Sequence, residues 1–182
     1  MGTFRNYLND AKTVNEIIRM FGEQNELISF YLEEGNHILI KSENVEIISR
    51  LINGEFPNYK EIIPKNFSFS FLFERALLIS KVKAVSAFSG NSNNIMFLFE
   101  KNTLTLSAKE SGAGEGNSTI TLEKPFTSNP LLITFNWRFL LDGLEGVDSE
   151  KVEMKINSEV QPIPFEPGHK TNFFYLLMPI KH

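Results

Sequence analysis

Cysteine is absent from the 182-residue sequence, so disulfide bonds, thiolate metal sites and cysteine nucleophiles are excluded. Long hydrophobic runs are also missing. The longest, 173–180, has eight residues, whereas a membrane-spanning helix needs about 20. The N-terminus lacks the positively charged and then apolar pattern of a signal peptide. These absences predict a soluble, cytoplasmic protein with no membrane partner.

An excess of positive charge is missing as well. The chain has 18 Lys and Arg against 22 Asp and Glu, which gives a net charge of −4. A protein held to DNA by a uniformly basic surface is therefore excluded, although a local basic strip on an acidic body is not. Hydrophobic residues make up 42% of the chain and include 17 Phe, an ordinary composition for a folded domain with a substantial core.

Motifs of catalysis are equally scarce. The three histidines have no spacing typical of metal ligands. Gly112, Gly114 and Gly116 lack the Lys-Ser/Thr ending of a phosphate-binding loop and do not open a helix, so we interpret 110–117 as a flexible hairpin loop. No nucleophile elbow or paired carboxylates are readable. We predict no enzymatic activity, no metal and no cofactor.

Helical periodicity is present in three stretches, 12–21, 74–88 and 136–144. In each, apolar residues recur on one helix face, and in the first and third they follow the i, i+3, i+4, i+7 spacing. Asp10 and Asn136 are the expected N-caps of the first and third helices. Gly22 is expected to end the first helix, and Gly143 with Gly146 the third.

Strands are predicted between the helices from β-rich and alternating segments. The predicted strands are 27–32, 37–41, 45–52, 67–71, 95–99, 103–108, 118–122, 131–135, 152–156, 160–165 and 172–178. A unit of one short helix and three or four strands therefore recurs three times. This pattern predicts an α+β fold in two parts, a half domain over 1–66 and a whole domain over 67–182.

Several cations lie off the apolar stripes of the predicted helices. If these helices line one surface, the cations would form a sparse positive strip suited to sequence-independent contact with phosphates. The candidates are Lys12, Arg19, Lys81, Lys83 and Arg138. The alternative is that they are ordinary solvated helix faces.

Two apolar features fall outside the predicted core pattern. Phe139 lies about 200° around its helix from Trp137, so either the C-terminal segment covers it or it lines a partner site. Residues 173–181 are apolar where chain ends usually fray. They form either a docked final strand or the wall of an apolar groove that contains the flexible Met178.

Four segments together resemble the bacterial DNA polymerase III β sliding clamp family. The junction of its second and third domains is similar to LINGEFPNYK at 51–60, and its C-terminal ending to YLLMPIK at 175–181. Its second-domain helix is similar to 12–19, and its last helix to 135–142. The segments occur in the family order at nearly the family spacing, over about residues 11–182.

The resemblance implies a non-enzymatic processivity factor with the DNA-clamp fold. In that family, head-to-tail dimers of three-domain chains form a ring with helices inside and antiparallel sheets outside. The ring encircles duplex DNA without sequence preference and tethers polymerases to it, which implies a cytoplasmic, nucleoid-associated protein. Residues 1–66 would be the second half of the middle domain plus a linker, and 67–182 the C-terminal domain. The cations named above would face the DNA.

The resemblance also implies a pocket for a short peptide rich in Gln, Leu and Phe. Polymerases, the clamp loader and repair proteins carry such peptides. The pocket residues carried over by motif are Pro57, Ile62, Asn136, Phe139, Val160, Pro162, Leu176, Leu177, Met178, Pro179, Ile180 and Lys181.

The sequence departs from the family pattern in places. Glu61 stands where the family often has Arg, and Asn53 and Glu55 differ from the usual residues around the intervening glycine. The counterparts of the first domain and of the first half of the second are absent. The alternative hypothesis is a truncated, clamp-like module or decoy that binds peptides without encircling DNA.

Overall fold

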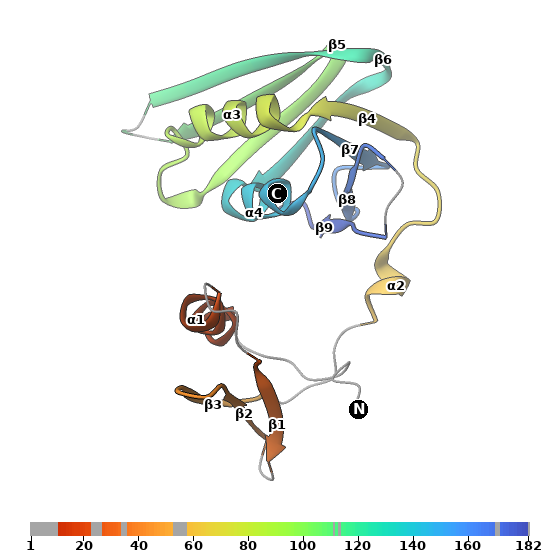
Figure 1. The fold of residues 1–182 in the computed structure, drawn as a ribbon. Helices are drawn as coiled ribbons and strands as arrows, with labels where there is room; N and C mark the ends of the chain where they lie inside the picture. The colour runs from red at the N-terminus through yellow and green to blue at the C-terminus, as the bar shows by residue number, and fades with distance from the viewer. Residues whose placement is uncertain are drawn as a thin grey trace. The chain divides into compact units, whose positions relative to one another are not determined.

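The computed structural model describes residues 11–22, 27–33, 36–52, 58–110, 112, 114–169 and 172–181. The chain divides into two compact units, Met1–Asn58 and Tyr59–His182, and each is described separately (Figure 1). This division lies eight residues before the predicted boundary at 66/67. The assignment of 1–66 and 67–182 to clamp domains stays a prediction.

The first unit is a helix on a three-stranded antiparallel sheet of order β1-β2-β3. Its elements are α1 (Ala11–Phe21), β1 (Ser29–Glu33), β2 (His37–Lys41) and β3 (Glu46–Arg50). The small core contains Phe21 of α1 with Ile38 and Ile40 of β2. The helix ends as predicted at Gly22, whose N–H donates to the Ile18 carbonyl at 2.7 Å. The predicted cap Asp10 lies outside the described residues.

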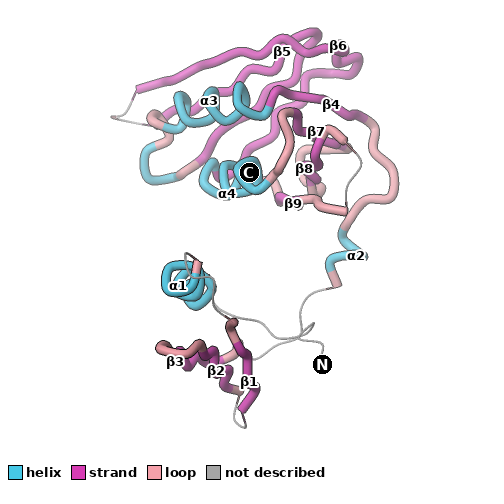
Figure 2. Tube along the Cα trace, in the orientation of Figure 1, coloured by secondary structure: helices cyan, strands magenta, loops and turns pink. Residues whose placement is uncertain are grey.

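The second unit contains two sheets together with the helices α2, α3 and α4 (Figure 2). One sheet has the order β4-β7-β8-β9, and the long strands β5 and β6 pair with each other. The elements of the second unit are α2 (Tyr59–Ile62), β4 (Phe69–Glu74), α3 (Arg75–Ser86), the 3-10 helix η1 (Gly90–Ser92), β5 (Asn94–Glu110), β6 (Gly114–Asn136), α4 (Trp137–Gly146), β7 (Lys151–Ile156), β8 (Ile163–Pro167) and β9 (Tyr175–Leu177). The helix α3 contacts β5, β6 and α4.

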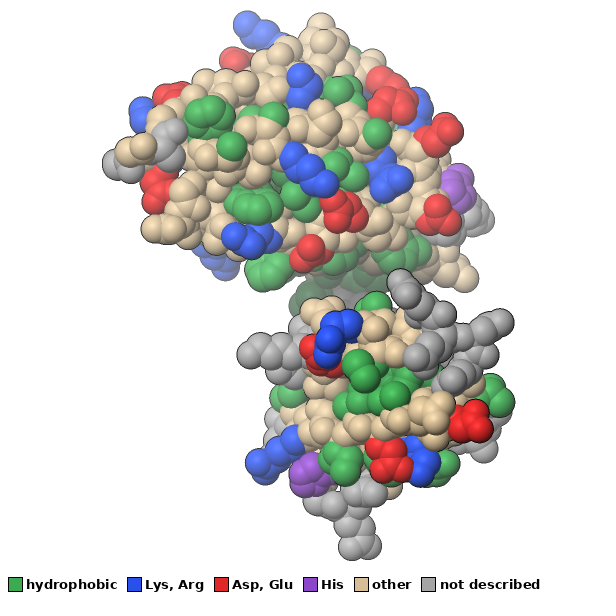
Figure 3. Space-filling view, turned by 60° about the vertical axis from the view of Figure 1, so that its left-hand side comes forward, with side chains coloured by type: hydrophobic (Ala, Val, Ile, Leu, Met, Phe, Trp, Pro, Cys, Tyr) green, Lys and Arg blue, Asp and Glu red, His purple; other side chains and the backbone are tan. Residues whose placement is uncertain are grey.

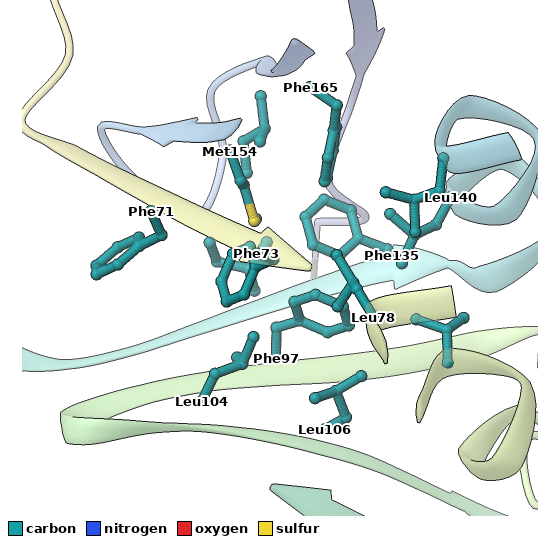
Figure 4. Close-up of a cluster of buried hydrophobic side chains, with 14 of the residues drawn as sticks. Phe71, Phe73, Leu78, Phe97, Leu104, Leu106, Phe135, Leu140, Met154 and Phe165 are labelled. Atoms are coloured by element: carbon teal, nitrogen blue, oxygen red, sulfur yellow. The ribbon is translucent and has the colours of Figure 1, made fainter. Parts of the chain in front are cut away.

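The core of this unit is formed by alternate residues of the strands and by the helix stripes (Figure 4). Phe97 of β5 and Phe135 of β6 pack edge to face, with ring centroids 5.3 Å apart. The predicted stripe of α3, Leu78, Val82 and Val85, is buried in the same cluster. Burial of each large apolar side chain contributes about 1.5–3 kcal/mol, so this cluster holds α3 on the sheets.

The structure differs most from the predicted strands in β5 and β6, and it also shortens the strands predicted at 160–165 and 172–178 to begin at Ile163 and Tyr175. The predicted breaks at 100–102 and 123–130 do not end strands, because β5 and β6 continue past them with shifts of register around Lys101. Lys101 has a left-handed φ of 50°, a conformation found at bulges and tight turns. The chain bends there within a continuous ladder.

The predicted flexible loop at 110–117 is largely a paired hairpin, in which Glu110 lies opposite Gly114. Gly116 is buried, and a Cβ added there would lie 2.2 Å from the ring atom Cδ2 of Phe88. A glycine is required at this position because Phe88 lies against the strand backbone. Close packing therefore accounts for Gly116, whereas Gly112 and Gly114 have left-handed φ values of 94° and 88°.

Candidate functional site

The N-terminus of α4 is fixed by hydrogen bonds to its first turn. As predicted, Asn136 is the N-cap, and its side-chain oxygen accepts the Arg138 N–H at 3.0 Å. The Trp137 N–H donates to the Asn93 carbonyl at 3.0 Å. These bonds set where the helix begins. The starting point in turn sets the direction in which Phe139, in the first turn, projects.

The C-terminal segment, defined as residues 172–181, runs antiparallel to α4. At one end the Tyr175 ring lies against Gly143, where an added Cβ would meet ring atoms at 2.2–2.8 Å. At the other end the Ile180 N–H donates to the carbonyl of Thr134, just before the helix begins, at 2.8 Å. The alternative of a docked final strand is thus correct in part, since β9 pairs with β8.

Two large apolar side chains lie between these fixed points and remain exposed. Phe139 is 56% exposed and Met178 is 50% exposed. Phe139 precedes Gly143 by four residues, about one helical turn, and Met178 lies between Tyr175 and Ile180 in the segment alongside. The hypothesis that the C-terminal segment covers Phe139 is wrong. Exposed aromatic and methionine side chains on an ordered framework are typical of protein-binding surfaces.

The turn between β7 and β8 borders the same surface. Ile163 pairs with Leu177, so the register continued by one residue places Pro162 opposite Met178. Val160, in the same turn, is 45% exposed. We define the α4–tail surface as Phe139, Val160, Pro162 and Met178, the predicted pocket residues carried by the first turn of α4, the turn between β7 and β8, and the C-terminal segment.

The remaining predicted pocket residues divide by burial. Leu177 and Pro179 are buried, and Leu177 belongs to the core. Leu177 therefore supports the surface from within the core, and its place in the pocket stays a prediction. Leu176 and Ile180 are half-buried and Lys181 is exposed.

Two predicted pocket residues come from the linker. Ile62 is 50% exposed at the end of α2. Pro57 lies outside the described residues.

Charge around the α4–tail surface is modest. The Arg138 guanidinium lies 4.8 Å from the centre of the Trp137 ring, and its Nε donates to the Asn93 side-chain oxygen at 3.1 Å. Burial raises the pKa of the Tyr175 hydroxyl above its ordinary value, and the Asp142 carboxylate acts in the same direction. Tyr175 is therefore neutral at physiological pH and packs as an apolar ring.

The candidate DNA-facing cations are distributed over both units. Arg19 pairs with Glu16 at 2.6 Å, and Lys83 pairs with Glu145 at 2.8 Å. Lys81 is half-buried and Arg138 is exposed. The side chain of the fifth candidate, Lys12, lies outside the described residues. Exposed ion pairs are weak and screened by salt, so the paired cations can exchange partners.

Sequence reasoning missed Gly143 and Tyr175 as parts of this surface. Gly143 and Gly146 are expected to end the helix together. The helix α4 does end at Gly146, but Gly143 is buried inside it. The available signal was Leu144, which continues the apolar stripe one residue past the glycine. A glycine within an intact stripe indicates close approach by another group.

Within the described ranges, no group of three or more His, Asp or Glu side chains is arranged to hold a metal ion. In that same part of the chain, no helix combines the length and the apolar character needed to cross a bilayer.

Comparisons with known proteins place this chain among related sequences. A family model described as "DNA polymerase III beta subunit, C-terminal domain" matches residues 60–181. "Beta sliding clamp" of Chlamydia muridarum is 30% identical over 179 residues, which cover 96% of this chain and 46% of that protein. "Beta sliding clamp" of Synechococcus elongatus is 27% identical over 176 residues, covering 94% and 46%. The chain thus spans about half the length of the curated relatives it matches.

Solved structures of sliding clamps also match this chain. The DNA polymerase III beta subunit of Thermotoga maritima matches with a TM-score of 0.72 and 26% identity, covering 94% of this chain and 46% of that one. A DnaN sliding clamp of Bartonella birtlesii, solved bound to griselimycin, matches with a TM-score of 0.77 and 25% identity over the same shares.

Proposed function

The chain belongs to the DNA polymerase III beta subunit family, and from this premise we propose that it supplies the C-terminal part of a sliding clamp. Such a clamp is a non-catalytic processivity factor that encircles duplex DNA. It tethers DNA polymerase, the clamp loader and repair proteins, as a homodimeric ring in its full-length form, in the nucleoid-containing cytoplasm. The observation that carries the proposal is the pair of exposed side chains, Phe139 and Met178, on the α4–tail surface.

The binding partner is a short peptide with Leu and Phe side chains. Phe139 offers a flat apolar face, and the flexible Met178 adapts to side chains of different shape. Burial of each Leu or Phe of the peptide contributes about 1.5–3 kcal/mol. The sliding clamp of Bartonella birtlesii, a member of the same family, was solved bound to griselimycin, which supports a ligand-binding role for clamps of this type.

Around these two anchors, the proposed site has an apolar wall and a polar end. Its described members are Ile62, Asn136, Phe139, Val160, Pro162, Leu176, Leu177, Met178, Pro179, Ile180 and Lys181. The exposed ammonium of Lys181 would attract an acidic group of the peptide. Pro57 completes the set by sequence resemblance alone.

DNA contact is proposed for the cations Lys12, Arg19, Lys81, Lys83 and Arg138. On a chain with a net charge of −4, so few cations displace few counterions, and binding is weak, independent of sequence and strongly dependent on salt. Binding that is insensitive to salt, or that prefers one sequence, would exclude this role.

A second candidate function is a peptide-binding module that does not encircle DNA. The ion pairs of Arg19 with Glu16 and of Lys83 with Glu145 favour it, because each pair must be given up before the cation contacts a phosphate. Retention on circular DNA, with release after the DNA is linearised, distinguishes a ring from this module.

The peptide site is tested by fluorescence anisotropy with a labelled Gln-Leu-x-Leu-Phe peptide. We expect Phe139→Ala and Met178→Ala each to weaken binding by about 10-fold or more, since a loss of 1.4 kcal/mol is tenfold. Their melting temperatures stay close to that of the parent protein because both side chains are exposed. Leu77→Ala is the matched control, since Leu77 is 43% exposed in the first turn of α3. Unchanged affinity in both variants, or an equal loss in the control, excludes the proposed site.

A further inference from the structure

The segment that joins α2 to β4, residues 63–68, is fixed to the end of β7 by one side chain. The Asn157 side-chain oxygen accepts the Ser68 N–H at 2.7 Å, and its amide nitrogen donates to the Asn66 carbonyl at 2.8 Å. An asparagine amide carries donors and an acceptor at once, so a single residue satisfies both backbone groups. We call these two hydrogen bonds the Asn157 clasp.

The place of Asn157 follows from the register of the sheet. Phe69 pairs with Ile156 where β4 begins and β7 ends, so Ser68 and Asn157 are the next two residues opposite each other in the antiparallel pair. There the Asn157 side chain, rather than its backbone, accepts the Ser68 N–H. The clasp therefore extends the hold of the sheet on the chain from Phe69 back to Asn66.

Phe67, between the two clasped residues, is held as well. The Lys155 ammonium lies 5.9 Å from the centre of the Phe67 ring, within the range of a cation–π attraction. The same ammonium pairs with Glu166 of β8 at 2.6 Å and with Glu153 of β7 at 3.5 Å. Three consecutive residues, 66–68, are thus anchored on the sheet.

Ile62 lies only four residues before Asn66. Four residues span at most about 14 Å, and Pro64 stiffens this stretch because it fixes its own φ and restricts the residue before it. Ile62 is 50% exposed, so its own burial holds it only weakly. The anchored Asn66 therefore limits the region in which Ile62 can lie.

The clasp is uncharged, in a unit whose surface charges are mixed. Figure 3 shows Lys and Arg side chains beside Asp and Glu side chains on the visible face of this unit. Exposed ion pairs of this kind are weak and screened by salt. The hydrogen bonds of a neutral amide are far less sensitive to salt, so the hold on the linker should persist at high ionic strength.

We propose that Asn157 is a positioning residue for the proposed peptide site, because by clasping Asn66 and Ser68 it holds Ile62 where a bound peptide contacts it. The inference rests on the proposed function, in which Ile62 is a member of the site. Phe139 is carried by α4 and acts without the clasp. The effects of Asn157 and Ile62 on peptide affinity are therefore coupled, whereas those of Asn157 and Phe139 are independent.

The test is a double-mutant cycle on the affinity for the labelled Gln-Leu-x-Leu-Phe peptide, at low and at high salt. Ile62→Ala should weaken binding roughly 5-fold, less than the loss expected for Phe139→Ala because a smaller side chain is removed. Asn157→Ala should weaken binding by a similar factor, and Ile62→Ala should add no further loss in that background. A merely structural role of Asn157 would instead give independent losses that multiply. Phe139→Ala should weaken binding by the same factor with and without Asn157.

Asn117→Ala is the matched control. Asn117 also donates from its side chain, to Glu115 at 3.4 Å, in an exposed part of β6. This variant removes an asparagine hydrogen bond from the same unit without touching the linker. Its peptide affinity, and the loss caused by Ile62→Ala in its background, should equal those of the parent protein.

Amide hydrogen exchange at Ser68 reports the clasp without peptide. The Ser68 N–H should be protected in the parent protein and exchange faster in Asn157→Ala. If Asn157→Ala fails to fold, Asn157→Asp takes its place, because the carboxylate still accepts the Ser68 N–H but cannot donate to Asn66. In that background Ile62→Ala should cost less than its full loss in the parent protein.

The outcomes separate the inference from the proposed function. Independent losses for Ile62→Ala and Asn157→Ala, an unchanged affinity in Asn157→Ala, or an equal loss in Asn117→Ala overturns the inference. The proposed site stands in these cases if Phe139→Ala still weakens binding. Absence of peptide binding by the parent protein, or binding that does not depend on Phe139 and Met178, overturns the proposed function and the inference with it.

Discussion

Gly143→Ala tests how the C-terminal segment is held against α4. A Cβ at this position would lie 2.2, 2.4 and 2.8 Å from the Cδ1, Cε1 and Cγ atoms of Tyr175. These distances are far below the roughly 3.5–4.0 Å of an ordinary contact between carbon atoms. The ring is attached directly to the segment and must move by about 1 Å or more. The displacement therefore reaches the backbone that carries Met178.

The expected cost follows from two opposing effects. Overpacking of a fitted site costs about 1–3 kcal/mol, while replacement of glycine by alanine inside a helix returns about 1 kcal/mol. The net loss of stability is up to about 2 kcal/mol, enough to lower the melting temperature by several degrees. Gly146→Ala makes the same substitution three residues later, where the added Cβ lies 3.8 Å from the Phe173 ring, an ordinary contact. It should be neutral or slightly stabilising.

The assay is thermal unfolding of the parent protein and of both glycine variants, with peptide affinity measured alongside. A double-mutant cycle with Tyr175→Ala isolates the contact, because Gly143→Ala should cost little once the ring is gone. Equal melting temperatures for Gly143→Ala and Gly146→Ala refute the reasoning. So does a cost of Gly143→Ala that is the same with and without Tyr175.

Two further predictions concern the same surface. Asn136→Ala should lower the free energy of unfolding by about 1 kcal/mol, because the Arg138 N–H loses its capping acceptor. Asn136→Asp should retain most of the stability of the parent protein. Equal losses for the two variants in chemical denaturation would exclude a capping role. Tyr175→Phe should reduce the loss of stability at alkaline pH. The pKa of Tyr175 is raised by burial and by Asp142, so its contribution is complete below pH 10, the ordinary tyrosine value, and is lost as the pH rises through the folded-state pKa. Parallel stability curves for Tyr175→Phe and the parent above pH 10 would contradict this assignment.

Much of the fold was predictable because periodicity is a local property. The strand at 37–41 and the helices at 12–21 and 74–88 are confirmed with boundaries shifted by at most two residues. The predicted α+β clamp fold is confirmed by the likeness to solved clamps. The continuity of β5 and β6 was not predictable, because it depends on pairing across a bulge at Lys101. From the sequence alone, a segment rich in turn-forming residues is predicted to be a loop, even where it is paired within a sheet.

The candidate site was likewise predictable only where local periodicity determines it. The exposure of Phe139 follows from its phase on the helix, which the sequence specifies. The burial of Leu177 does not follow from a local pattern, because β9 has only three residues and its orientation is set by pairing with β8. The seat of Tyr175 on Gly143 joins segments 32 residues apart, and no local pattern reveals it.

The most direct test of the partner-binding role is to observe which residues respond to a bound peptide. We would record backbone amide NMR spectra of the chain during titration with the Gln-Leu-x-Leu-Phe peptide. We expect saturable shifts at Phe139, Met178 and Ile180, with β1 and β2 unaffected. Saturable shifts confined to other parts of the molecule, or none at a large excess of peptide, would contradict it.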